Sequence, residues 1–189
     1  MYIISGSLKR RKICFPLNSN IRPILMRIRA TIFDVLQFRV PSEPLILDCF
    51  AGTGSLGFEA FSRWGGKLFF FENDKKIFDL LEKNILNLGV AVFTELLNIN
   101  ALKPPVTKSP MDLIFIDPPY ASSHIIKDII KHLLKRGWLK NGTIIVCATD
   151  KKHKLETPEY CEIFKETTMA SSNISFFYVV LDNIIDFAG

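Results

Sequence analysis

The chain has 189 residues, 48% of them hydrophobic and 23% charged, and its formal net charge is +5 at pH 7. This length corresponds to about one domain, and the apolar fraction suffices for a sizeable core, so one compact globular unit is expected. No uncharged apolar run reaches the roughly 18 residues of a membrane helix, and the apolar start, residues 2–4, is too short for a signal-peptide core, so a cytoplasmic protein without a membrane partner is expected.

The cysteines and histidines give no pattern of a metal site. The four cysteines have no C-x-x-C spacing, and Cys49 and Cys147 lie in apolar, strand-like runs. They are predicted to be reduced packing residues rather than a disulfide frame or zinc ligands. The three histidines are scattered, and no metal is predicted.

Positive charge is concentrated at the start of the chain. Residues 1–40 contain eight Lys or Arg and a single acidic residue, Asp34, whereas the rest of the chain is slightly acidic. A segment of this kind is expected to meet a polyanion. The alternative is that the basic run is only a solvated surface.

The first forty residues predict a small hairpin and a helix. Residues 2–4 and 13–15 are short apolar stretches separated by a Ser-Gly-Ser turn and a cationic run, which predicts two short strands. From Arg22 the pattern becomes helical, because Pro23 suits a first helical position and apolar residues then recur at spacings of three and four up to Leu36. Residues 41–44, with two prolines, end this segment.

Strands and helices alternate through the rest of the chain. Strands are predicted at residues 45–50, 67–72, 90–97, 111–116 and 142–148. Helices are predicted after the loop at residues 51–57 up to about residue 64, and at residues 74–88 and 124–136. This alternation predicts βαβ units, and hence an α/β fold with a mostly parallel central sheet and helices on both faces. Two further strands, at residues 161–165 and 174–181, predict an antiparallel hairpin at one sheet edge.

A glycine-rich loop follows the first strand of this α/β region. Residues 52–57 read GTGSLG, which fits G-x-G-x-x-G between a strand and a helix, and Glu72 ends the next strand. The glycines allow the backbone to approach a ligand, and the acid can accept hydrogen bonds from ribose hydroxyls. The same pattern binds dinucleotides. Asp48 favours a cationic cofactor, because its carboxylate would repel a pyrophosphate, although it could instead cap the turn.

The second motif, Asp117-Pro118-Pro119-Tyr120, follows a buried strand. Two successive prolines make a stiff loop at the carboxyl end of that strand, where open α/β sheets bind ligands. A carboxylate and a carbonyl beside an aromatic ring suit a flat base with an exocyclic amino group. The alternative is a strand-ending turn with a surface Asp.

These motifs together resemble the RsmD family of methyltransferases, which modify a guanine at its exocyclic N2 in 16S ribosomal RNA. The resemblance is carried by residues 47–63 (LDCFAGTGSLGFEAFSR), Glu72 and the Asp-Pro-Pro-Tyr motif. The start of the chain is also similar, with Ile-Ile-Ser-Gly at residues 3–6, Arg-Lys at 11–12, Arg-Pro at 22–23 and Arg-Ile-Arg at 27–29. The likeness runs from about residue 2 to residue 150.

The chain departs from the family at two places. Ile24, Met26 and Ala30 stand where the family usually has Thr, Asp and Glu, and residues 170–172 stand where it has Tyr-Gly. These departures concern the substrate side more than the chemistry, because the cofactor loop and the Asp-Pro-Pro-Tyr motif are intact.

The resemblance implies a Rossmann-like methyltransferase fold that uses S-adenosyl-L-methionine, in one domain over residues 1–189 with a basic extension at 1–40 and a catalytic fold at 45–189. It implies 16S ribosomal RNA or a small-subunit assembly particle as partner, and a monomer is expected. Asp117 and Pro118 would hold the amino group while Tyr120 stacks on the base. The residues expected to bind the cofactor are Asp48, Ala51, Gly52, Gly54, Glu72, Asn100 and Ala101. Phosphate contacts are expected from Lys9, Arg10, Arg11, Arg22, Arg27 and Arg29.

Three other functions fit parts of the pattern. An amine methyltransferase acting on another RNA, on DNA adenine or on protein glutamine shares the Asp-Pro-Pro-Tyr motif. An NAD-dependent oxidoreductase shares the glycine loop, but Asp48 and the proline loop count against it. A non-catalytic RNA-binding module would account for the altered residues Ile24, Met26 and Ala30.

Overall fold

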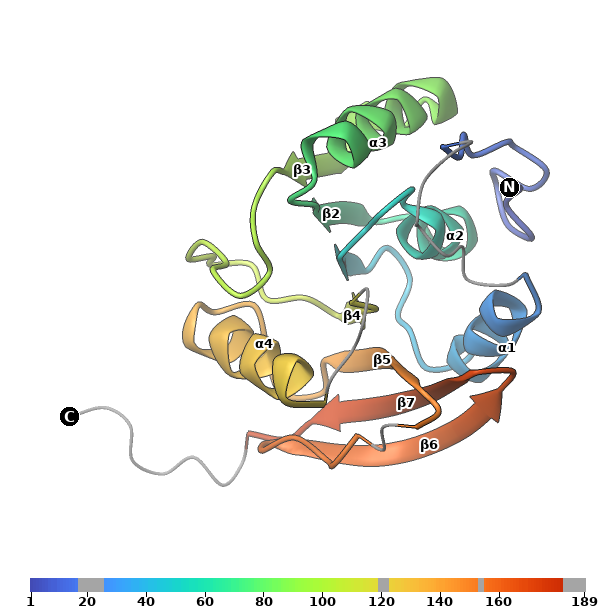
Figure 1. The fold of residues 1–189 in the computed structure, drawn as a ribbon. Coiled ribbons are helices and arrows are strands. Elements are labelled where there is room, and N and C mark those ends of the chain that lie inside the picture. Colours follow the sequence, from blue (N-terminus) through green and yellow to red (C-terminus); the bar gives the residue numbers. More distant parts are fainter. Residues whose placement is uncertain (17–25, 119–122, 153–154, 182–189) are drawn as a thin grey trace.

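A computed structural model describes residues 1–16, 26–118, 123–152 and 155–181. Its centre is a seven-stranded sheet with the strand order β3-β2-β1-β4-β5-β7-β6 (Figure 1). The strands are β1 (Leu45–Cys49), β2 (Lys67–Phe71), β3 (Thr94–Leu97), β4 (Leu113–Ile116), β5 (Ile144–Asp150), β6 (Cys161–Met169) and β7 (Ser172–Val179). The helices are α1 (Met26–Leu36), α2 (Ser55–Trp64), α3 (Lys75–Leu88) and α4 (Ser123–Lys135), with a 3-10 turn η1 (Ala91–Phe93).

The sheet is mostly parallel, as predicted. The five strands from β1 to β5 run parallel to one another, whereas β7 pairs antiparallel with both β5 and β6. Four of these five parallel strands, β1, β2, β4 and β5, are largely buried, which is why they read as apolar runs in the sequence. The predicted Rossmann-like α/β fold with a C-terminal hairpin is therefore confirmed.

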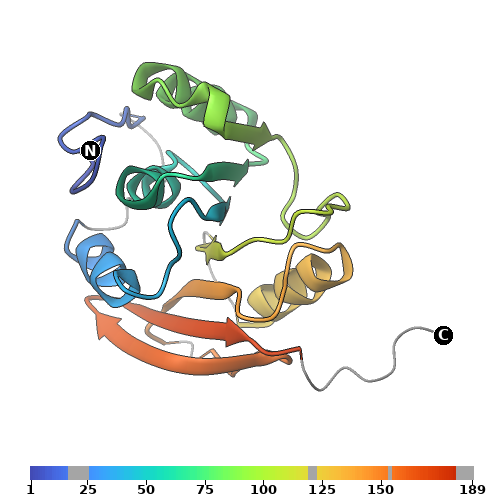
Figure 2. The same cartoon turned by 180° about the vertical axis from the view of Figure 1, so that it is seen from behind.

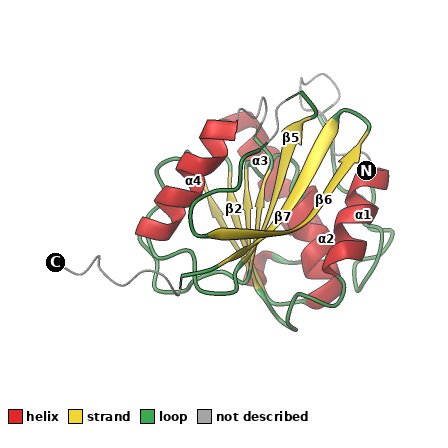
Figure 3. Ribbon diagram, turned by 90° about the horizontal axis from the view of Figure 1, so that it is seen from below, coloured by secondary structure: helices red, strands yellow, loops and turns green. Residues whose placement is uncertain are grey.

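Helices cover both faces of the sheet. Figures 1 and 2 show α1, α2 and α3 on one face and α4 on the other, and Figure 3 shows the strands lying between α4 and the pair α1 and α2. Each face has its own apolar cluster. The first cluster includes Phe33, Phe58 and Phe115, and the second includes Ile116 and Leu133.

The third strand and the last helix differ from the sequence prediction. The strand expected from residue 90 begins only at Thr94, because Gly89 ends α3 in the left-handed conformation and the 3-10 turn η1 follows. For α4 the sequence predicts Ile125, Ile129, Leu133 and Leu134 as the inward side chains. In the structure Ile126 and Ile130 are buried as well, whereas Ile125 and Leu134 are only partly buried. The buried stripe of α4 is thus rotated slightly from the expected one.

The N-terminal segment, residues 1–16, packs onto α2 and α3 rather than standing apart. Its two expected strands are reduced to one antiparallel bridge between Tyr2 and Lys12. Ile3 is 2% exposed and Ile13 is fully buried, and both belong to the first apolar cluster. Gly6 permits the close approach to α2, since a Cβ at this residue would lie 1.7 Å from the carbonyl oxygen of Ser62.

Candidate active site

The glycine loop and the Asp-Pro-Pro-Tyr motif begin at the same edge of the sheet. β1 and β4 are neighbouring parallel strands, and Cys49, the last residue of β1, pairs with Ile116, the last residue of β4. The loop that starts at Phe50 therefore leaves the sheet beside Asp117. The two motifs found in the sequence, more than 60 residues apart, are adjacent in the fold.

The two predicted cofactor glycines in this loop have different surroundings. Both have positive φ, 56° at Gly52 and 80° at Gly54, and the amide of Gly54 donates to the carbonyl of Ala51 at 2.7 Å. A Cβ on Gly54 would lie 2.4 Å from the Phe58 ring and 2.6 Å from a Leu81 methyl group. A Cβ on Gly52 would meet nothing closer than 3.9 Å. The open side of Gly52 is therefore where a ligand can approach the backbone.

Glu72 follows β2 and is held in one orientation by backbone amides. It is 9% exposed, and its two carboxylate oxygens accept hydrogen bonds from Gly52 N and Asp74 N, both at 2.9 Å. Each oxygen retains a further lone pair, so the carboxylate can also accept ribose hydroxyls. The carbonyl of Glu72 accepts from the Asn98 side chain at 2.8 Å, which joins the end of β3 to the same site.

Asp48 lies beneath the loop. It is 2% exposed, and its Oδ2 accepts a hydrogen bond from Gly57 N in the first turn of α2 at 3.0 Å. Burial raises its pKa well above the usual value, the Gly57 hydrogen bond opposes this, and the nearby carboxylates of Asp117 and Glu72 raise the pKa further. Asp48 thus holds the helix start, as the alternative reading of the sequence allowed, and it also places a third acid next to Asp117 and Glu72.

Asn100 and Ala101, which the resemblance to the family predicts to bind the cofactor, lie beyond the end of β3. Asn100 is exposed, and its Oδ1 accepts from Leu102 N at 2.9 Å, so its side chain shapes a local turn. Ala101 is 3% exposed and packs in the apolar cluster on the α4 face.

The catalytic residues predicted from the sequence are only partly described. Asp117 is half-buried and Pro118 is buried directly after β4. Tyr120 lies outside the described residues, and its stacking role stays a prediction.

The predicted phosphate contacts fall into three groups. Lys9, Arg10, Arg11 and Arg27 are exposed. Arg22 lies outside the described residues. Arg29 was wrongly predicted to face RNA, because it is fully buried and donates hydrogen bonds to the Tyr2 carbonyl and the Met1 sulfur.

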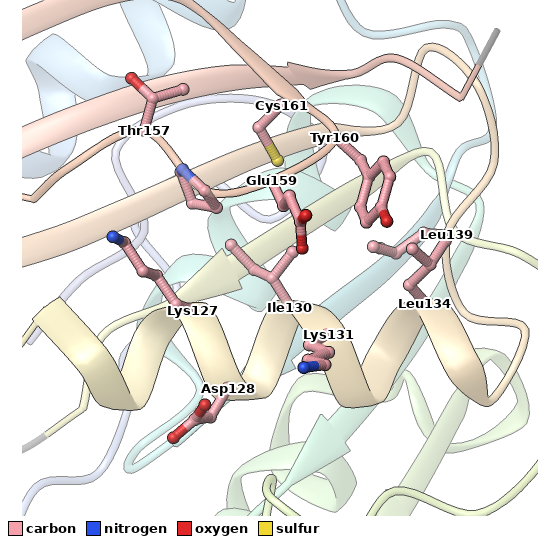
Figure 4. A pocket seen from close by; sticks show the side chains of 11 residues that line it. Lys127, Asp128, Ile130, Lys131, Leu134, Leu139, Thr157, Glu159, Tyr160 and Cys161 are labelled. Carbon is pink, nitrogen blue, oxygen red and sulfur yellow. The ribbon is translucent and has the colours of Figure 1, made fainter. Parts of the chain in front are cut away.

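Two hollows lie elsewhere on the surface. The larger one, drawn in Figure 4, lies between α4 and residues 157–161. Its lining includes Cys161, which pairs with Val179 at the end of β7. Burial raises the pKa of Cys161 to about 12, which leaves its thiol protonated and unreactive. None of the predicted site residues lines either hollow.

The described residues contain no group of three His, Cys, Asp or Glu that could hold a metal ion, and none of the described helices is both long and apolar enough to cross a membrane. All four cysteines are free, and Cys49 and Cys147 are buried in strands as predicted.

Comparison with known proteins gives consistent matches along most of the chain. The family model described as Conserved hypothetical protein 95 matches residues 1–178. The ribosomal RNA small subunit methyltransferase D of Buchnera aphidicola (subspecies Acyrthosiphon pisum) is 38% identical over 168 residues, which cover 88% of the chain and 86% of that protein. The protein of the same name from Haemophilus influenzae is 35% identical over 170 residues, 88% of the chain and 87% of its own length.

Solved structures share the fold. A structure described as putative methyltransferase yhhF from Escherichia coli superposes with a TM-score of 0.82 at 27% identity, covering 95% of the chain and 98% of that protein. An RNA methyltransferase from Salinibacter ruber, solved in complex with S-adenosyl-L-homocysteine, has a TM-score of 0.68 at 13% identity and covers 89% of the chain and 100% of that protein. At this low identity the second match supports the fold alone.

Proposed function

The chain belongs to the RsmD family of ribosomal RNA small subunit methyltransferases, and on this premise we propose that it transfers a methyl group from S-adenosylmethionine to a guanine of 16S ribosomal RNA. The proposed acceptor is the exocyclic N2 of the base, and the proposed target is the guanine at position 966. The substrate is the RNA itself or a small-subunit assembly particle.

One observation carries this proposal: the half-buried carboxylate of Asp117 and the open backbone of Gly52 lie at the ends of adjacent parallel strands, on one edge of the sheet. A methyl donor bound along the glycine loop and a base held at Asp117 would therefore be neighbours. Such positioning lowers the activation barrier, because the entropy cost of bringing the two reactants together is met on binding.

The residues around Gly52 fit S-adenosylmethionine. Glu72 presents a fixed carboxylate toward ribose hydroxyls, and the absence of a side chain on Gly52 leaves room for the ligand. Asp48, Asp117 and Glu72 together make this edge acidic, which suits a cationic cofactor and disfavours the pyrophosphate of a dinucleotide. When bound, S-adenosylmethionine supplies a methyl group on a positively charged sulfur.

Asp117 and Pro118 act on the acceptor nitrogen. The N2 lone pair of guanine is delocalised into the ring and is a weak nucleophile. Hydrogen bonds from its two protons to the Asp117 carboxylate and the Pro118 carbonyl orient the nitrogen and favour a tetrahedral geometry. As the N–C bond forms and the C–S bond breaks, the nitrogen loses one proton, which Asp117 or a water molecule accepts. Tyr120 stacks on the base once it has left its helix or loop.

The proposal is tested by incubating the purified chain with methyl-labelled S-adenosylmethionine and small ribosomal subunits that lack the modification. Digestion and mass spectrometry are expected to identify N2-methylguanine, and its position in the RNA is then mapped. Asp117→Asn removes the charged acceptor and is expected to abolish the product. Asp128→Asn, which changes an exposed acid on α4, is the matched control and should leave the activity unchanged.

The outcome also separates the alternatives. Label in protein glutamine or DNA adenine, with none in ribosomal RNA, would replace the substrate while retaining the chemistry. No transfer to any acceptor, together with RNA binding, would favour a non-catalytic RNA-binding module. Binding of NADH without binding of S-adenosylmethionine would overturn the methyltransferase proposal entirely.

A further inference from the structure

Asn84, in the middle of α3, is a buried polar residue on an otherwise apolar helix face. It is fully buried, and the neighbouring buried residues of α3 are Leu81, Ile85 and Leu88. A buried carboxamide is stable only when its oxygen and nitrogen are paired. Its partners therefore indicate what it holds together.

Among the described residues, the Asn84 side chain makes three hydrogen bonds, and all of them go to the backbone of distant segments. Its Oδ1 accepts from Cys14 N at 2.8 Å, and its Nδ2 donates to Cys14 O at 3.1 Å and to Thr53 O at 3.2 Å. Cys14 belongs to the N-terminal segment, residues 1–16. Thr53 stands between Gly52 and Gly54 in the cofactor loop. One side chain thus joins the N-terminal segment to the loop.

The contact with Thr53 fixes the part of the loop that determines its shape. Thr53 is 4% exposed, and its carbonyl belongs to the peptide group that continues into Gly54 N, which itself donates to Ala51 O at 2.7 Å. Because a peptide group is planar, holding its carbonyl oxygen also fixes the direction of its N–H. The Asn84 hydrogen bond therefore helps to keep the turn in the form that leaves Gly52 open.

The contact with Cys14 fixes the N-terminal segment at its far end. That segment carries the exposed residues Lys9, Arg10 and Arg11, and Arg11 donates to the carbonyl of Asn87 on the same helix at 2.5 Å. Figures 1 and 2 show the segment beside α2 and α3. The basic side chains are thus carried by a segment whose docking depends in part on Asn84.

We propose that Asn84 is a positioning residue that couples the docking of residues 1–16 to the shape of the cofactor loop. This inference rests on the proposed function, since it takes the loop as the S-adenosylmethionine site and the segment as an RNA contact. Cofactor binding stabilises the loop conformation that Asn84 holds, and so also stabilises the docked segment. Because such coupling is reciprocal, RNA on the segment strengthens cofactor binding by the same factor.

The test compares the wild-type chain with Asn84→Ala. S-adenosylhomocysteine is titrated calorimetrically, and hydrogen exchange is followed by mass spectrometry in peptides covering residues 1–16 and 50–58, with and without this ligand. Two variants of α3 serve as controls. Asn87 is exposed and accepts the Arg11 hydrogen bond through its backbone carbonyl, so Asn87→Ala retains this contact. Ile85→Ala lowers stability through a buried apolar side chain, which cannot form a hydrogen bond to either segment.

In the wild-type chain, the ligand is expected to slow exchange in both peptides. In Asn84→Ala, we expect about tenfold weaker binding and no effect of saturating ligand on residues 1–16, while protection of residues 50–58 persists. Ile85→Ala should retain the response of both peptides, which separates coupling from a general loss of stability. Asn87→Ala should behave as wild type.

Two results would overturn the inference. One is a wild-type N-terminal peptide that does not respond to the ligand, and the other is a response in Asn84→Ala equal to that of wild type. In both cases ligand binding by the wild-type chain leaves the proposed function standing. A wild-type chain that binds no S-adenosylhomocysteine would instead overturn the proposed function, and this inference with it.

Discussion

At the scale of single residues, the two glycines of the cofactor loop differ in what surrounds them. Both adopt positive φ, which costs an L residue about 1–2 kcal/mol. Gly54 is also enclosed by Phe58 and Leu81, whereas Gly52 faces open space. Gly54 therefore serves packing, and Gly52 serves access by the ligand.

The contrast predicts different effects of the same substitution. Gly54→Ala should lower the free energy of unfolding by about 3 kcal/mol, because steric overlap adds to the backbone strain. Gly52→Ala should cost only about 1–2 kcal/mol of stability but should weaken S-adenosylhomocysteine binding strongly, since the new methyl group occupies the ligand side. Urea unfolding and calorimetric titration measure the two quantities. Equal stability losses in both variants would contradict this division.

Asp48 should make cofactor binding pH-dependent. Its pKa in the folded chain is raised, mainly by burial, so it is protonated at a higher pH than an ordinary Asp. A cationic ligand favours the ionised form, so below this raised pKa binding is coupled to the release of a proton. We expect the affinity for S-adenosylmethionine to increase as the pH rises through this raised pKa.

Asp48→Asn supplies the comparison. The amide oxygen of Asn can still accept from Gly57 N, so the start of α2 is retained. Affinity for S-adenosylmethionine should then vary much less with pH. S-adenosylhomocysteine, which lacks the positive sulfur, should show the weaker dependence already in the wild-type chain. An unchanged pH profile in the variant would assign the dependence to another group.

At the scale of elements, α2 carries both the end of the cofactor loop and the attachment of the N-terminal segment. Its Glu59 is fully buried and accepts hydrogen bonds from Ile4 N at 2.7 Å, Ser5 N at 3.1 Å and Arg63 Nε at 2.9 Å. Its carboxylate also faces the buried guanidinium of Arg29, whose pKa is lowered by burial despite this favourable charge. A buried acid with these partners is costly to replace.

Glu59→Gln should therefore loosen the N-terminal segment. The amide nitrogen of Gln cannot accept a hydrogen bond, and the charge that balances the buried arginine is lost, so we expect about 3 kcal/mol of lost stability. Limited proteolysis should cut the segment faster than in wild type. Glu82→Gln, at an exposed position of α3, is the control and should change neither measurement.

What the sequence could predict at this scale follows from how local each signal is. The buried parallel strands were found because they are continuous apolar runs, and the cofactor loop because its glycines and Glu72 lie close in sequence. The roles of Asn84 and Glu59 were missed, because their partners are 70 and 54 or 55 residues away. Arg29 was misjudged because a basic residue beside apolar ones reads the same whether it is exposed or buried.

The C-terminal hairpin was underestimated for a related reason. β6 continues through Glu166, Thr167 and Thr168 to Met169, although these residues are polar. It is the edge strand of the sheet and is exposed over much of its length. Its hydrogen bonds to β7 therefore stabilise it, and its sequence has no apolar pattern. A strand of this kind is visible only once its partner is in place.

At the scale of the whole molecule, charge is divided between two regions. The acidic residues Asp48, Glu72 and Asp117 gather at the carboxyl edge of the sheet, whereas exposed basic side chains lie on the N-terminal segment. A cationic cofactor and an anionic RNA can therefore each be attracted to a separate part of the molecule. This arrangement predicts that RNA affinity, unlike cofactor affinity, depends steeply on salt.

The double variant Lys9→Ser/Arg10→Asn tests that division. Both side chains are exposed, and Asn suits residue 10 because the φ of Arg10 is 68°. If each residue neutralises one phosphate, the slope of log affinity against log salt should fall by about 1.5–2. The control Lys131→Ser/Lys135→Ser removes the same charge from exposed positions on α4, across the sheet, and should leave the slope unchanged. Equal losses in both variants would mean that net charge, rather than the N-terminal segment, governs RNA binding.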